Sequence, residues 1–123
     1  MALDYFYNVV KKDITMVKGD TMAFGFQLQG LDGSMPDDII FSCKNDPDAE
    51  NGIFDCKLSA GDGVWIDAED PDQDLLTYGV RVAPEKTENI DAGRYFYDLE
   101  INVNNDVFTL MKGRLIIEYD VTR

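Results

Sequence analysis

The chain has 123 residues and a mass of 13.9 kDa, which is enough for one domain with a sizeable core and too little for two ordinary domains. Asp and Glu number 24 against 11 Lys and Arg, and the net charge of −13 excludes nucleic acid and anionic lipid as partners. Histidine is absent, which removes the commonest general base, the usual zinc ligand and every Ser-His or Cys-His nucleophile. Because 45% of the residues are hydrophobic, we expect one folded domain over residues 1–123.

The sequence also predicts where the chain is made. No apolar run approaches the roughly 18 residues that a membrane span needs, and the segment 1–4 lacks the basic region of a signal peptide. We therefore expect cytoplasmic synthesis, with no membrane contact.

The first thirteen residues precede the regular pattern and are a candidate N-terminal arm (1–13). Three consecutive rings, Tyr5, Phe6 and Tyr7, lie within it. Aromatic residues are favoured anchors at protein interfaces, so this arm could dock on a neighbouring subunit. The alternative is an edge strand that covers the end of the domain.

Alternation of apolar and polar residues dominates the rest of the chain, and no long stretch keeps apolar residues at helical spacing. Turn residues separate the alternating runs, and the segment 84–90 favours one short helical turn. About eight strands, each with one apolar face, predict an all-β fold: an antiparallel, immunoglobulin-like β-sandwich. The expected strands are 14–17, 21–29, two strands carrying 39–43 and 54–58, then 64–67, 75–82, 93–103 and a last strand after residue 105.

Two cysteines, Cys43 and Cys56, lie on two of these strands without metal-ligand spacing. A hairpin whose loop is centred on 49–50 places Cys43 opposite Cys56 and Phe41 opposite Leu58. Directly opposed side chains have Cβ atoms about 4.5–5.5 Å apart, which is long for a relaxed disulfide. The sequence therefore favours two buried thiols, with a cross-strand disulfide as the alternative.

The last two predicted strands are joined by Asn104-Asn105, which suits a type I′ turn because asparagine tolerates the left-handed region. Beyond this turn Phe108 and Leu110 share one phase of the alternation, whereas the apolar residues from Leu115 onward take the other. We expect a β-bulge or a change of sheet at Lys112-Gly113, with the glycine at the bulge.

Two acidic clusters begin with the spacing of a calcium loop but do not continue it. The first has a leucine where an EF-hand needs its turning glycine, and both have a cation at the twelfth position. Solvated loops are therefore favoured, and no metal or other cofactor is expected. The clusters are Asp67, Glu69, Asp70, Asp72 and Asp74, and Asp46, Asp48 and Glu50.

No feature marks a pair of carboxyl groups in an apolar pocket, so the sequence predicts no catalytic residue and no enzyme activity. One structural motif does appear, because Asp91, Gly93 and Tyr95 have the spacing of the tyrosine corner of immunoglobulin-like domains. In that comparison Tyr97 takes the place of the second cysteine of antibody domains, so their inter-sheet disulfide is missing.

Three segments resemble small structural proteins of tailed bacteriophages and prophages, particularly the N-terminal domains of upper-baseplate and tail-tip proteins. The first is similar to their opening strand and Gly-Asp-Thr turn, the second to their late Gly-x-Tyr-x-Tyr strand, and the third to their last strand. The segments are Asp13–Thr21, Ala92–Glu100, and Thr109-Leu110 with Gly113–Ile117 and the end Asp120–Arg123.

The resemblance implies a non-enzymatic virion part or assembly component that acts through contacts with other tail subunits or with itself, as a homo-oligomer in the second case. It implies a place in the virion after cytoplasmic synthesis. The alternative is a ligand-binding β-sandwich module of a bacterial protein, for carbohydrate or calcium. Three aromatic side chains over a flat sheet face would favour the carbohydrate alternative.

Overall fold

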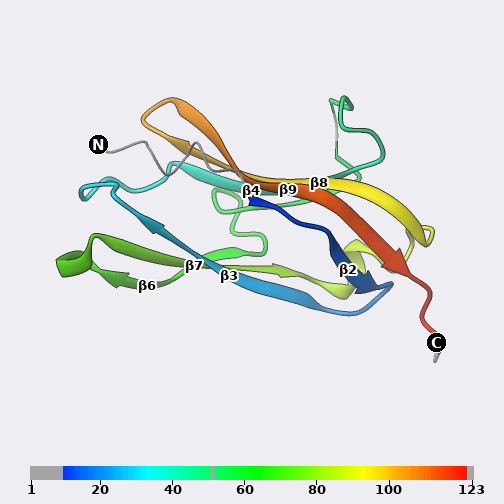
Figure 1. Ribbon diagram of the computed structural model, residues 1–123. Helices are drawn as coiled ribbons and strands as arrows, with labels where there is room; N and C mark the ends of the chain where they lie inside the picture. Colours follow the sequence, from blue (N-terminus) through cyan, green and yellow to red (C-terminus); the bar gives the residue numbers. More distant parts are fainter. Residues whose placement is uncertain (1–9, 51, 122–123) are drawn as a thin grey trace.

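The structure is a computed structural model that describes residues 10–50 and 52–121 (Figure 1). Within these residues the chain forms nine strands and two short 3-10 helices but no α-helix, which confirms the predicted all-β class. The strands are β1 Val10–Lys11, β2 Ile14–Val17, β3 Met22–Gln29, β4 Asp38–Lys44, β5 Phe54–Lys57, β6 Val64–Asp70, β7 Leu75–Val82, β8 Gly93–Val103 and β9 Asp106–Glu118. The 3-10 helices are η2 Pro71–Gln73 and η3 Pro84–Lys86, the second within the predicted helical turn.

The strands form two sheets that pack face to face (Figure 1). Among the described residues, the larger sheet has the order β1-β9-β8-β4-β5. β2, which follows β1 in the chain, also pairs with β9. The smaller sheet has the order β3-β7-β6. All pairs are antiparallel except those of β1 and β2 with β9, which are parallel.

This strand order is that of an immunoglobulin-like sandwich. The row β5-β4-β8-β9 matches strands C′-C-F-G, and the row β3-β7-β6 matches B-E-D. The predicted immunoglobulin-like sandwich is thus confirmed, with β1 and β2 as a divided first strand beside strand G.

The core lies between the sheets and follows the predicted alternation. On β8, every second residue from Tyr95 to Val103 is buried, and the residues between them face outward. On β3, the apolar phase from Met22 to Leu28 faces inward in the same way. Thr87 is the single buried polar side chain in the described part of the chain, and its hydroxyl accepts a hydrogen bond from the Gly19 N–H at 3.0 Å.

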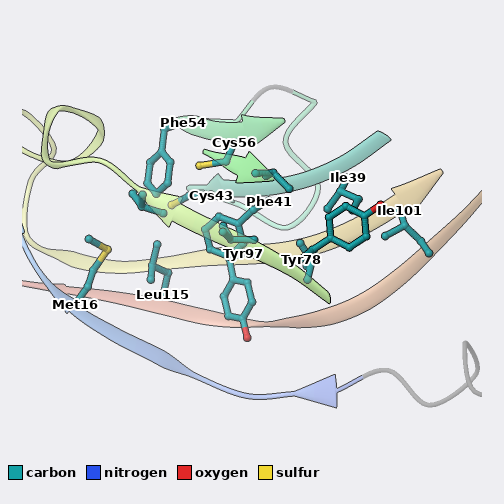
Figure 2. Packing of buried hydrophobic residues seen from close by; sticks show 14 of the residues in the cluster. Met16, Ile39, Phe41, Cys43, Phe54, Cys56, Tyr78, Tyr97, Ile101 and Leu115 are labelled. Carbon is teal, nitrogen blue, oxygen red and sulfur yellow. The ribbon is translucent and has the colours of Figure 1, made fainter. Parts of the chain in front are cut away.

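Phe41 of β4 is the centre of an aromatic cluster that joins the sheets (Figure 2). Its ring centroid lies 5.6 Å from that of Phe24 on β3, in an edge-to-face arrangement across the core. It also lies 5.5 Å from the ring of Tyr97 on β8 and 6.5 Å from that of Phe54 on β5. β3, β4 and β8 match the strands that carry the disulfide and the tryptophan in antibody domains, and here each of them contributes a ring to the cluster.

The predicted register of the β4–β5 hairpin is wrong. Cys43 pairs with Phe54 rather than Cys56, and Cys56 pairs with Phe41, so the loop is centred one residue earlier than predicted. The connection contains a turn in which the Asp46 carbonyl accepts the Ala49 N–H at 3.0 Å. Each thiol then lies beside a phenyl ring, which fills the core better than two small side chains opposite each other.

The bulge on the last strand is also not where the sequence predicts it. The register changes between the pairs Leu99–Met111 and Glu100–Thr109, so the extra residue is Leu110 and not Gly113. Gly113 has a different role, because the first strand crosses it at close range. A Cβ at Gly113 would lie 2.0 Å from the Lys12 carbonyl oxygen.

Two further corrections concern the ends of predicted elements. The strand expected at 64–67 continues to Asp70, with an irregularity at Asp67, so the start of the predicted acidic loop belongs to an edge strand. In the arm predicted at 1–13, Val10 and Lys11 form β1 and belong to the larger sheet. The predicted type I′ turn is confirmed, since Asn104 and Asn105 have φ of 51° and 71°.

The role of Gly113 gives a first prediction. Gly113→Ala should destabilise the fold by about 1–3 kcal/mol, because the added methyl group would force the backbone of β1 and β2 away from β9. Thermal unfolding measures the effect. Gly25→Ala is the matched control, since its Cβ would meet the nearest atom at an ordinary 3.4 Å. Equal melting temperatures for the two variants would contradict the close crossing.

The thiols give a second prediction. Burial raises the pKa of Cys43 to about 12 and that of Cys56 to about 11, and both side chains are free thiols in the core. Because the thiolate is the reactive form, neither cysteine should react with a thiol reagent in the native protein at pH 8, and both should react in denaturant. Rapid native labelling, or an oxidised pair resistant to labelling in denaturant, would contradict this arrangement.

Candidate functional site

The candidate site lies on the outer face of the larger sheet, where neighbouring strands align their outward side chains in two rows. In one row Ser42, Asp98 and Lys112 lie side by side on β4, β8 and β9, and Lys11 of β1 extends the row. In the next row Lys44 and Phe96 lie beside Arg114. These rows point outward because the residues between them on β4 and β8, such as Cys43 and Tyr97, are buried.

These rows form the floor and sides of a hollow of about 530 Å³, which we call the outer hollow. Pro47, from the connection between β4 and β5, forms part of its wall, and this connection stands above the sheet in Figure 1. The full lining is Lys11, Asp13, Ser42, Lys44, Pro47, Phe96, Tyr97, Asp98, Thr109, Lys112, Gly113 and Arg114.

The first strand is fixed against this hollow by three contacts. The Tyr97 hydroxyl donates to the Lys12 carbonyl at 2.5 Å, and the Lys12 N–H donates to the Lys112 carbonyl at 3.0 Å. The Asp13 carboxylate accepts the backbone N–H of Arg114 at 3.1 Å. Gly113 has no side chain, which allows the first strand to cross β9 at this point. The wall of the hollow therefore depends on residues that are far apart in the sequence.

Charge in the outer hollow is opposite to that of the whole protein. Four cations line it against two carboxylates, although the chain carries 24 acidic residues and 11 basic ones. Within residues 10–50 and 52–121, none of the four cationic side chains forms an ion pair or donates a side-chain hydrogen bond. The cations are Lys11, Lys44, Lys112 and Arg114.

Two carboxyl groups of β8, Asp98 and Glu100, are half-buried on this outer face. Burial raises the pKa of Asp98, and the charges of Lys44 and Lys112 oppose that shift. Burial also raises the pKa of Glu100, helped by the negative charge of Asp98. The open surface with exposed cations suits binding of a carboxylate better than proton transfer.

The tyrosine corner residues come together at the start of β8. The Tyr95 hydroxyl donates to the carbonyl of Asp91 at 2.5 Å, as in the corner of immunoglobulin-like domains, while Gly93 begins the strand. Tyr95 is buried. This contact fixes the turn before β8 and leaves no open surface for a ligand.

Three carboxylates of the acidic clusters accept hydrogen bonds from backbone N–H groups. The Asp46 carboxylate accepts the N–H of Asp48 at 2.9 Å, and the Asp70 carboxylate accepts that of Gln73 at 3.3 Å. Both oxygens of Asp74 accept from the N–H of Asp32, at 3.0 and 3.2 Å. Among the described residues, no three acidic or cysteine side chains converge as a metal site would need.

The predicted interface residues, Tyr5, Phe6 and Tyr7, lie outside the described residues.

The sequence did not predict the outer hollow. One residue could have indicated the hollow, because Phe96 is aromatic but lies in the polar phase of β8, beside Asp98. The cations around Phe96 come together only through the register of three strands. In the described part of the chain, no helix is long and apolar enough to cross a membrane.

Comparison with known proteins adds the fold alone. No family model and no curated protein sequence matches the chain. Among solved structures, the chain resembles part of a family 123 glycoside hydrolase from Clostridium perfringens that hydrolyses glycolipid glycans, with a TM-score of 0.55 and 12% identity. The match covers 98% of this chain and 26% of the hydrolase, so the chain spans about a quarter of that enzyme.

A second similar structure is the extracellular domain of the voltage-gated sodium channel β4 subunit, which forms parallel homodimers in cell-cell adhesion. The TM-score is 0.40 at 10% identity, and the match covers 90% of this chain and 93% of that one.

The half-buried carboxyl group gives a third prediction. A raised pKa means that folding disfavours the ionised Asp98, so its contribution to stability is full below the unfolded pKa of about 3.9 and is lost as pH rises through the folded value. Asp98→Asn should therefore raise the melting temperature at pH 7, and the gain should vanish near pH 3. Asp106→Asn, at an exposed site on the adjoining strand, controls for the general loss of negative charge. An equal gain in both variants would contradict the desolvation of Asp98.

Proposed function

We propose that the chain is a structural or assembly component of a tailed bacteriophage or prophage virion and acts through contacts with other tail subunits or with itself. The observation that carries this proposal is the outer hollow, an open surface of the larger sheet whose four cations form no ion pair with another described residue. The hollow is open and has four cations in its lining, and complementary charge across an interface guides and selects protein partners.

The three phage-like segments support the proposal by their position. They lie on β2, β8 and β9, which are adjacent strands although the segments are far apart in the sequence. Each segment contributes to the outer hollow: Asp13 from the first, Phe96 and Asp98 from the second, and Gly113 and Arg114 from the third. The residues that carry the resemblance therefore also form the surface to which we assign the contact.

In this proposal the same surface acts by binding and not by catalysis. Burial raises the pKa of Asp98 and that of Glu100. Both side chains nevertheless lie on an open face of the sheet, beside exposed cations. In this proposal the chain reaches the virion after cytoplasmic synthesis.

The second candidate, a carbohydrate-binding module, has one observation in its favour. The ring of Trp65 on β6 lies flat over Gly79 of β7, where a Cβ would come within 2.3 Å of the indole. Gly25 of β3 pairs with Gly79, so two glycines lie side by side on the outer face of the smaller sheet. This face is therefore flat beneath the tryptophan, which is 43% exposed. Sugars stack on such rings, but within the described residues this face offers one aromatic side chain, not three.

Coexpression tests the proposal. The chain should coelute in gel filtration with a tail or baseplate protein encoded beside its gene, and Lys112→Glu with Arg114→Glu should abolish coelution. Lys18→Glu with Arg81→Glu makes the same change in net charge elsewhere and should leave coelution intact. Trp65 is the sole tryptophan of the chain, so its fluorescence reports on the second candidate directly. Failure to coelute, together with a saturable fluorescence change on adding soluble glycans, would contradict the proposal.

A further inference from the structure

The outer hollow is complementary in charge to another part of the same chain. Residues 67–74, which we call the acidic tip, comprise the end of β6, the helix η2 and the residue before β7. Five carboxylates fall within these eight residues. The hollow, by contrast, has four cations against two carboxylates, and one of those two is the Asp13 side chain that already accepts the Arg114 N–H.

Part of the acidic tip has no partner within the described chain. Asp70 and Asp74 accept backbone hydrogen bonds from Gln73 and Asp32, so their carboxylates shape the tip itself. Asp67, Glu69 and Asp72 are exposed, and none of them forms a hydrogen bond or an ion pair with another described residue. Three carboxylates are therefore available on the tip for the cations of the hollow.

The two surfaces cannot meet within one molecule. The acidic tip belongs to the smaller sheet, whereas the outer hollow lies on the face of the larger sheet that points away from the smaller one. In Figure 1 the tip is the end of the β6–β7 hairpin, in the layer below β4, β8 and β9. A contact between tip and hollow therefore requires two molecules.

We infer that the outer hollow of one copy receives the acidic tip of a second copy, so that the chain associates head to tail. This inference rests on the proposed function and names the partner as the chain itself. Lys112 and Arg114, the exposed cations of β9, would face Asp67 and Glu69 of the neighbouring copy. Since the two patches differ, the contact is heterologous and generates a ring or a filament.

The net charge of −13 opposes this association at long range but not at contact. Charges separated by more than about 8 Å are largely screened at physiological ionic strength, whereas ion pairs at contact distance are not. Association should therefore be strongest near 0.15 M salt and weaker at very low salt, where the two acidic molecules repel each other. At 1 M salt the screening length falls to about 3 Å, and the contact should dissociate.

Reversing the charge on each surface tests the inference by light scattering and sedimentation. The hollow variant, Lys112→Glu with Arg114→Glu, and the tip variant, Asp67→Lys with Glu69→Lys, should each associate at least about tenfold more weakly than the native chain. An equimolar mixture of the two variants should regain association, because each then offers the patch that the other lacks. The variant with all four substitutions should also associate.

The control is Lys18→Glu with Arg81→Glu, which has the net charge of the hollow variant and should associate like the native chain. All substituted residues of the hollow and tip variants are exposed, and unchanged melting temperatures exclude misfolding. A native chain that stays monomeric at 0.15 M salt, a mixture that stays monomeric, or association that persists at 1 M salt would overturn the inference. A monomer that still coelutes with a tail protein would overturn the self-contact and leave the proposed function standing.

Discussion

The contact between Phe24 and Phe41 is the interaction on which the sandwich depends, because it joins two sheets that no disulfide connects. Phe41 also contacts the rings of Phe54 and Tyr97. Such an aromatic pair contributes about 0.5–1.5 kcal/mol beyond the area that it buries. Of the three pairs, Phe24–Phe41 crosses between the sheets, and the other two join neighbouring strands of the larger sheet. A chain with two reduced, buried thiols can therefore keep the immunoglobulin-like arrangement in a reducing compartment.

The same cluster connects the core to the outer hollow through Tyr97. Its ring packs on Phe41, while its hydroxyl reaches the backbone of Lys12 at the junction of β1 and β2. That junction crosses Gly113, and Asp13 then accepts the N–H of Arg114. The wall of the hollow is thus held by the core, which fixes the backbone from which Lys112 and Arg114 extend.

The alternation of residues predicts the strands well and their registers poorly. Most strands lie close to their expected positions, because each has one apolar face that must be buried. The pairing of Cys43 with Phe54 instead of Cys56 moves the partner by two residues, which leaves the same side chains in the core. A shift of two preserves the face, so alternation cannot distinguish the two registers. The outer hollow was missed for the same reason, since it exists only once β4, β8 and β9 are aligned.

Two of the strands at the edges of the sandwich resist pairing with a further strand. β6 is an edge strand, but its register is irregular at Asp67 and its end carries exposed carboxylates. Bulges and charges of this kind prevent the addition of a further strand. At the edge of the larger sheet, β5 has four residues in the structure. Addition of a further strand is therefore discouraged at the β5 and β6 edges, whereas the eight-residue β3 and the short strands β1 and β2 form the other two edges of the sheets.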